Sequence, residues 1–329
     1  AHHNFALSSP DGGATAQLTN GGEMRALGAM NLAASDFTNS GKLLSSGAGT
    51  LSADQLTNSG VAYAGGALSV TAASLTNNAD MLSDDSISVN AGTLDNNSVI
   101  ASAGAVQLST TGKLANSGSA VVEAGSQLTV NAGGAISNAA SARMTGASVD
   151  MTGSQGLANQ GVLEASGGDA KLRVSGTVAN SGRIQSRGKL DMADAAGGGS
   201  QAVSNSGWIQ ANGSSAIRAG SLSNSNVWLL STQAGSAASS VAVSGQLTNA
   251  SDAVLQATTD ATINAGNVVN QADGLLRAGG SLSINTSGAA GVNNAGTVQA
   301  GGTLGASGTG ALTNANGATL LGDSLQVAM

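Results

Sequence analysis

Few side chains in this 329-residue sequence could serve as acids, bases or metal ligands. His2 and His3 are the only histidines, and no further ligands of a suitable type lie nearby, so they indicate an unpacked chain end and not a metal site. Asp84 and Asp85 form an acidic pair. Calcium-binding β-rolls need a glycine- and aspartate-rich nonapeptide repeated over many turns, which this sequence lacks, so the pair is typical of a solvated turn.

Phosphate binding and catalysis are no better supported. The stretch DAAGGGSQA, residues 194–202, lacks the lysine and the following helix of a phosphate-binding loop, and an insertion into a long repeat explains it better. Glycan-cleaving enzymes gather carboxylates or bases in a groove. Here they occur singly, as Glu23, Arg25, Lys42, Asp54, Glu123, Arg143, Glu164, Lys171 and Arg183. We expect no enzyme, no catalytic residue, no metal site and no cofactor; a polysaccharide-active β-helix enzyme stays as the minor alternative.

The composition limits the possible partners. The chain has 49 Gly, one Pro, no Cys and 2% aromatic residues, with 41% apolar residues and a net charge of −7. That is too apolar and too weakly charged for a disordered coil. The acidic balance argues against a nucleic-acid partner. No apolar run is long enough to span a bilayer, so we expect no membrane insertion.

An internal repeat dominates the sequence. The pattern apolar–any–Asn recurs at intervals of 19 to 25 residues, which is the signature of a solenoid. The repeated asparagines are Asn20, Asn39, Asn58, Asn77, Asn96, Asn116, Asn138, Asn159, Asn180, Asn205, Asn224, Asn249, Asn270, Asn294 and Asn314.

Within each repeat, apolar residues alternate with a period of two, which predicts short β-strands. One coil cannot bury its apolar row, but stacked coils about 4.8 Å apart can. We therefore predict an all-β parallel β-helix of about 15 coils with three short strands each, spanning residues 18–320 between a ragged end at 1–17 and a truncated coil at 321–329. Asparagine suits the corners, where stacked carboxamides can bond one another in a ladder.

Positions three and five residues after each asparagine should face outward. They place Leu44, Tyr63 and Leu82 in one column, and Trp208 and Leu229 on the same face further along. Exposed apolar columns can mark an interaction site. The alternative is that they are merely tolerated or covered by a loop. The longest coils predict side loops near residues 194–202 and 231–240, where recognition is often placed.

The repeats resemble a known family. "LTNSG", "LTNNA", "LANSG", "LANQG", "VANSG" and "VSNSG", each followed by an apolar strand and then "AG", "SG" or "GG", are similar to filamentous haemagglutinin repeats, from about Leu18 to about Leu320. The resemblance implies a right-handed helix, which agrees with the general handedness of parallel crossovers. It also implies the shaft of a large exoprotein, an adhesin or a contact-dependent growth-inhibition effector, that is secreted by two-partner secretion to the surface of a Gram-negative bacterium.

The same resemblance implies partners. They are the outer-membrane transporter of the two-partner system and a host or bacterial surface receptor. The family's secretion domain carries Asn-Pro-Asn motifs, but the only proline here is Pro10, so we expect that signal outside this sequence. A direct receptor-binding adhesin segment is the alternative to a shaft. Open terminal strands also predict end-to-end self-association.

Overall fold

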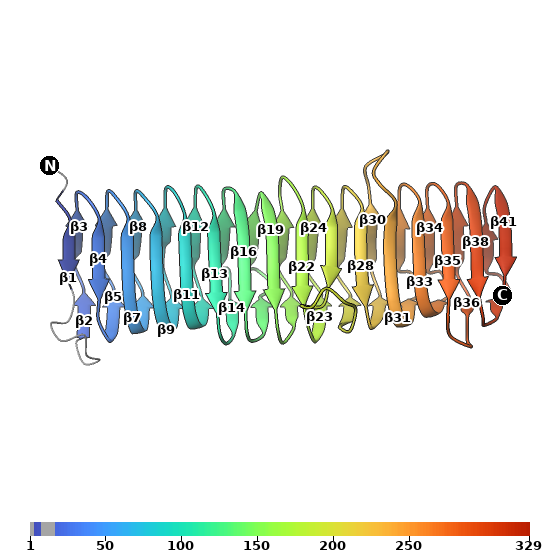
Figure 1. The fold of residues 1–329 in the computed structure, drawn as a ribbon, viewed down its shortest axis with the longest axis horizontal. Helices are drawn as coiled ribbons and strands as arrows, with labels where there is room; N and C mark the ends of the chain where they lie inside the picture. The colour runs from blue at the N-terminus through green and yellow to red at the C-terminus, as the bar shows by residue number, and fades with distance from the viewer. Residues whose placement is uncertain (1–2, 8–16) are drawn as a thin grey trace. The chain divides into compact units, whose positions relative to one another are not determined.

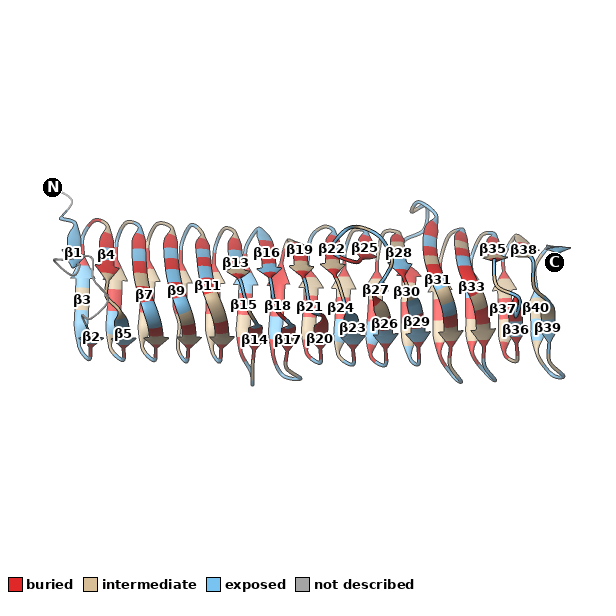
Figure 2. Cartoon of the chain, turned by 60° about the horizontal axis from the view of Figure 1, so that its bottom comes forward, coloured by how far each residue is buried: buried red, intermediate tan, exposed pale blue. Residues whose placement is uncertain are grey.

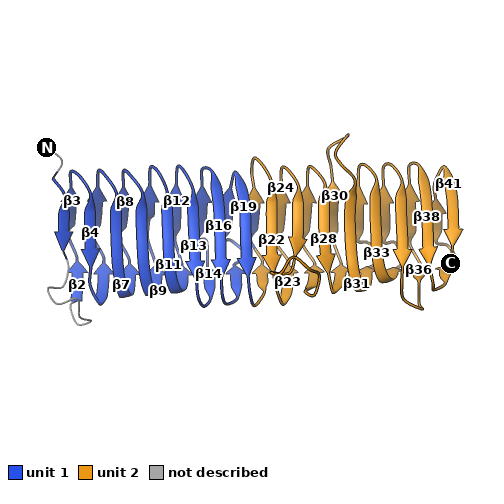
Figure 3. Cartoon of the chain, in the orientation of Figure 1, with its two compact units in different colours: residues 1–154, 161–163 blue, residues 155–160, 164–329 orange. Residues whose placement is uncertain are grey.

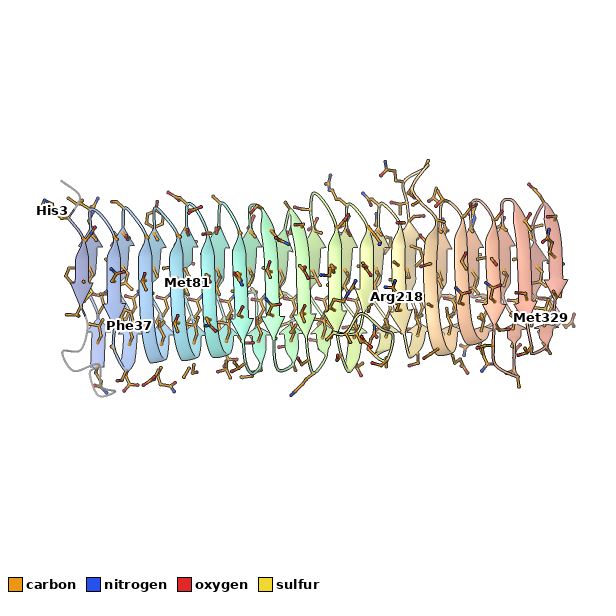
Figure 4. The ribbon with its side chains drawn as sticks, in the orientation of Figure 1. His3, Phe37, Met81, Arg218 and Met329 are labelled. Carbon is orange, nitrogen blue, oxygen red and sulfur yellow. The ribbon has the colours of Figure 1, made fainter. Side chains whose placement is uncertain are left out.

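The computed structural model describes residues 3–7 and 17–329, so His2 and Pro10 lie outside the described residues. All regular secondary structure in the described ranges is β-strand. The chain divides into two compact units, residues 1–154 with 161–163 and residues 155–160 with 164–329 (Figure 3). Each unit is a stack of coils whose strands pair in parallel, which confirms the predicted parallel β-solenoid of about 15 turns (Figure 1). The right-handed turn stays a prediction.

Unit 1 has two parallel sheets. Sheet A holds the strands that end at the repeated asparagine and those of the arm before them: β1 (Phe5–Leu7), β2 (Gln17–Asn20), β4 (Met30–Ala33), β5 (Asp36–Asn39), β7 (Gly49–Asn58), β9 (Leu68–Asn77), β11 (Ile87–Asn96), β13 (Val106–Thr110), β14 (Leu114–Asn116), β16 (Gln127–Ala132), β17 (Ile136–Asn138) and β19 (Ser148–Gly153). Sheet B holds the strands that follow the asparagine: β3 (Glu23–Ala26), β6 (Lys42–Ser45), β8 (Val61–Ala64), β10 (Met81–Ser83), β12 (Val99–Ser102), β15 (Val121–Ala124) and β18 (Arg143–Gly146).

Unit 2 repeats this plan. Its sheet A strands are β20 (Leu157–Asn159), β22 (Ala170–Val174), β23 (Thr177–Asn180), β25 (Leu190–Ala193), β26 (Ala202–Asn205), β28 (Ser215–Ala219), β29 (Ser221–Asn224), β31 (Ser239–Asn249), β33 (Ala261–Asn270), β35 (Leu282–Thr286), β36 (Val292–Asn294), β38 (Thr303–Gly308), β39 (Leu312–Asn314) and β41 (Ser324–Ala328). Its sheet B strands are β24 (Arg183–Ser186), β27 (Trp208–Ala211), β30 (Val227–Ser231), β32 (Val254–Ala257), β34 (Leu275–Ala278), β37 (Thr297–Ala300) and β40 (Thr319–Leu321). Strand β21 (Val162–Ala165) is divided between the units.

The three arms of a coil do not always form three separate strands. In β7, β9, β11, β31 and β33 the two sheet A arms merge into one strand of 10 or 11 residues. Strand β11 pairs along its length with β9, but with both β13 and β14 in the following coil. The bend between these arms is therefore gentle enough for the parallel ladder to continue through it.

The apolar columns fill the interior of each unit. Leu56, Leu75 and Leu94 occupy equivalent positions on consecutive coils, and each is almost completely buried. Burial alternates with exposure along most strands, so one side chain in two faces the core (Figure 2). Burial of these columns is the main favourable term in folding, at about 25 cal/mol per Å² of apolar surface.

Small residues are required where coils approach each other at the turns. A Cβ atom added to Gly60 would lie 2.0 Å from the carbonyl oxygen of Gly41 in the preceding coil. Any larger residue would force the two turns apart. This close approach explains the Ser-Gly that follows several of the repeated asparagines.

Candidate interaction surface

The repeated asparagines form a buried column inside each unit. In unit 1, Nδ2 of each asparagine from Asn20 to Asn116 donates a hydrogen bond of 2.7–2.9 Å to Oδ1 of the next. In unit 2, the same bonds of 2.7–2.9 Å run from Asn159 to Asn314. Asn314 is exposed, whereas the other members of the column are buried.

A second bond engages the other amide hydrogen. Nδ2 of Asn39 also donates to the backbone carbonyl of Val61 at 3.2 Å, and Nδ2 of Asn77 to that of Val99 at 3.0 Å. These carbonyls belong to sheet B of the following coil. The carboxamides therefore tie sheet A to sheet B, and within the buried column they are engaged with the protein itself.

The outward column of unit 1 is half-buried. Leu44, Tyr63 and Leu82 stand on consecutive strands of sheet B in direct register. The hydroxyl of Tyr63 donates a 2.5 Å hydrogen bond to Oδ2 of Asp84. That bond to the carboxylate, with smaller effects of burial and of the negative charge, raises the pKa of Tyr63 above its usual 10.0.

The corresponding face of unit 2 carries a longer apolar column. Trp208 is 40% exposed and stands in register with Val227, Val254 and Leu275 on successive coils. Leu229 is the next outward-facing residue after Val227 on β30, and it is half-buried. The structure thus places each predicted contact residue on the outer side of sheet B. It does so in two separate groups, one in each unit.

Two features of unit 2 escaped sequence reasoning. Trp228 is completely buried between Ile209 and Leu255, and its Nε1 has no hydrogen-bond partner among the described residues. Its position four residues after Asn224 could have revealed this, because that position is buried in most coils. The register of β30 against β32 shifts just after it, between Leu229 and Ser231.

The second feature is an ion-pair group on the outer side of sheet A. Nη2 of Arg173 donates to Oδ2 of Asp191 at 2.6 Å, and Nη1 of Arg218 lies 3.8 Å from Oδ1 of the same carboxylate. Burial alone would raise the pKa of Asp191, but the hydrogen bond and the positive charge of Arg173 outweigh it and the pKa is lowered. The residues are 18 and 27 apart in sequence, so only the coil register brings them together.

The irregular segment 194–201 lies beside this group, where a side loop was predicted. The Asp194 carboxylate holds it from within: Oδ1 accepts the amide of Gly198 at 2.8 Å, and Oδ2 accepts the amide and the hydroxyl of Ser200 at 3.0 and 2.7 Å. These bonds, that of the Ser200 hydroxyl first, lower the pKa of Asp194. The loop therefore has a defined conformation.

The described residues contain no group of three or more His, Cys, Asp or Glu side chains placed to hold a metal ion. No helix suited to crossing a membrane occurs in ranges 3–7 and 17–329.

Comparison with known families decides the type of repeat. Residues 260–328 match the family model described as the haemagglutinin repeat. These residues are therefore similar to haemagglutinin repeats. They begin at the start of β33 and extend through β41, and they include Asn270, Asn294 and Asn314 of the asparagine column. No curated protein and no solved structure gives a significant match to the chain.

The haemagglutinin repeat match confirms the resemblance to a filamentous haemagglutinin-like repeat region. The coils before residue 260 carry the same corner asparagine, the same two sheets and the same inward positions. Haemagglutinin repeats belong to a structural and adhesin family whose members are secreted or lie at the cell surface, and a filamentous adhesin-like stalk fits this fold.

Proposed function

We propose that this chain is a shaft segment of a secreted or cell-surface exoprotein of a Gram-negative bacterium, either a filamentous adhesin or a contact-dependent growth-inhibition effector. Its task is mechanical: it presents a distal module away from the cell that carries it. The asparagine column is the observation that carries the proposal. The same asparagine bond links each coil to the next at the same corner. A shaft can therefore be lengthened by adding coils of one kind.

The proposal makes whole coils interchangeable. Removal of residues 59–77 joins Asn58 to Asn78, takes out one 19-residue coil and leaves each neighbour its usual partner. We expect the shortened protein to fold with nearly unchanged stability, because repeat stability is a sum of nearest-neighbour terms. Removal of residues 59–68, about half a coil, is the matched control and should prevent cooperative folding. A shaft in which both deletions were equally damaging would contradict the proposal.

A second candidate function is direct adhesion through the outward columns of sheet B. The exposed Trp208 and the apolar residues in register with it favour this reading. Labelled protein should then bind epithelial or bacterial cells saturably, and Trp208→Ser or Tyr63→Ser should weaken that binding. Saturable binding that neither substitution changes would exclude these columns as the contact.

Export and assembly complete the proposal. A chain without cysteine and with one proline could cross the outer-membrane transporter unfolded and add coil to coil as it emerges. End-to-end self-association is also proposed, because the strand edges of a solenoid are pairing templates. Sedimentation that stays monomeric over a wide concentration range would remove the self-association.

A further inference from the structure

Unit 2 carries a groove on the outer side of sheet A, away from the apolar columns of sheet B. It encloses about 500 Å³ and lies over β28, β31, β33 and β35. The segment 194–201 forms one wall, where Gly199 lies against the backbone of Arg218 and Ala219. A second, smaller groove of about 230 Å³ shares Asn285 and continues toward Ser307 and Gln326. The volume of the larger groove suits a small-ligand site.

The groove has a rigid wall. The Asp194 carboxylate accepts three hydrogen bonds from its own loop, so the loop does not depend on a ligand for its shape. A preformed wall lowers the entropic cost of binding.

Along the floor, register puts Arg218, Ala242, Asn264 and Asn285 on consecutive coils. Nδ2 of Asn285 donates to Oδ1 of Asn264 at 2.8 Å. Nδ2 of Asn264 has no acceptor among the described residues. The strands of Asn264 and Arg218 are two coils, or about 10 Å, apart. Ala242 lies between them, and its small side chain leaves a gap between the Asn264 amide and Arg218.

A buried hydroxyl in the groove is also unpaired. Thr286 lines the groove, is 6% exposed, and its Oγ1 has no hydrogen-bond partner among the described residues. Thr110 occupies the corresponding strand position in unit 1 and donates to the carbonyl of Gly112 at 2.9 Å. An unsatisfied buried hydroxyl costs about 1–3 kcal/mol, so its presence needs an explanation.

Among the described residues, Arg218 is the only Lys or Arg residue that lines the groove. Asp191 already accepts the short bond from Arg173, and the Arg218 side chain is half-exposed with its nearest carboxylate oxygen 3.8 Å away. The Arg218 guanidinium therefore has donors to offer an anion.

We propose that this groove binds an acidic saccharide, with a sugar carboxylate held by Arg218 and the sugar hydroxyls held by Asn264, Asn285 and Thr286. Amides and hydroxyls in a row match a polyhydroxylated chain. No aromatic side chain lines the groove for base stacking, which disfavours a nucleic acid. The floor strands β31 and β33 are paired on both sides, so a peptide cannot add as a further strand.

Titration calorimetry with tetragalacturonate tests the proposal, and the fully methyl-esterified tetrasaccharide serves as the uncharged control. We expect saturable binding of the acid and at least tenfold weaker binding of the ester. Arg218→Gln should weaken binding of the acid at least tenfold, and Ala242→Leu should abolish it by filling the gap. Arg277→Gln removes a cation of the same unit that does not line the groove and should leave binding unchanged.

Circular dichroism confirms that each variant folds. Equal binding of acid and ester, or binding that neither groove substitution alters, would overturn the proposal. Citrate carries carboxylates without a sugar; if it bound as tightly as tetragalacturonate, the site would be a simple anion site and the saccharide assignment would be wrong. None of these outcomes bears on the coil-deletion test of the shaft.

Discussion

Nδ2 of Asn58 donates a 2.8 Å hydrogen bond to Oδ1 of Asn77, the residue in direct register on the next coil. The same amide reaches the backbone carbonyl of Asp80 at 3.3 Å, at the start of the next sheet B arm. One side chain thus links two coils and two sheets. Because the bond repeats at each corner within a unit, removal of one asparagine leaves unpaired groups on both neighbours.

Asn77→Ala should lower the free energy of unfolding by about 2–3 kcal/mol, because Nδ2 of Asn58 and Oδ1 of Asn96 both lose a buried partner. Asn97→Ala is the matched control. Its amide bonds Asn78 at 2.9 Å on the exposed outer side of the same corner, and its loss should cost less than about 0.5 kcal/mol. Equal effects in urea denaturation would contradict a structural role for the buried column.

The two tryptophans should differ strongly. Trp228→Ala should destabilise the protein by about 3–5 kcal/mol, because it empties the core between Ile209 and Leu255. Trp208→Ala should cost less than about 1 kcal/mol, because that side chain is 40% exposed. Thermal unfolding of both variants measures the difference. Similar losses of stability would contradict the buried position of Trp228.

Much of this fold could be predicted from the sequence, because each coil carries the same short pattern of residues. The apolar–any–Asn pattern fixes one corner per coil, and register follows, so the burial of Leu56, Leu75 and Leu94 could be predicted. The groove could not. Arg218, Asn264 and Thr286 are 22 to 68 positions apart, and coils of unequal length hide which of them share a column.

Tyr63 is the only tyrosine, so ultraviolet absorbance reports its ionisation alone. The hydrogen bond to the Asp84 carboxylate favours the neutral phenol, and we expect the pKa of Tyr63 to lie above 10.0. Asp84→Asn removes that negative charge and should bring the pKa down toward 10.0. A pKa that stays unchanged in the variant would show that the 2.5 Å bond does not form in solution.

The loop at residues 194–201 should loosen in acid. Its hydrogen bonds hold the pKa of Asp194 below the ordinary 3.8. The stability that these bonds give the loop is therefore complete above pH 3.8, and it is lost as the pH falls through the lower pKa of the folded state. Hydrogen exchange at the amides of Gly198 and Ser200 should therefore show protection near neutral pH and lose it only when the pH falls below 3.8. Asp194→Asn should remove this pH dependence, and protection that persists in acid would contradict the role of the carboxylate.

Distances between coils test the central claim, a stiff parallel stack with a constant rise. Because the chain has no native cysteine, a spin label on Asn31→Cys can be paired with one on Ser88→Cys, Gln107→Cys or Thr129→Cys, three, four and five coils further along unit 1. Electron–electron double resonance should give narrow distributions whose centres increase by about 5 Å per coil. Broad distributions, or centres that do not increase in equal steps, would contradict the stack and the shaft built on it.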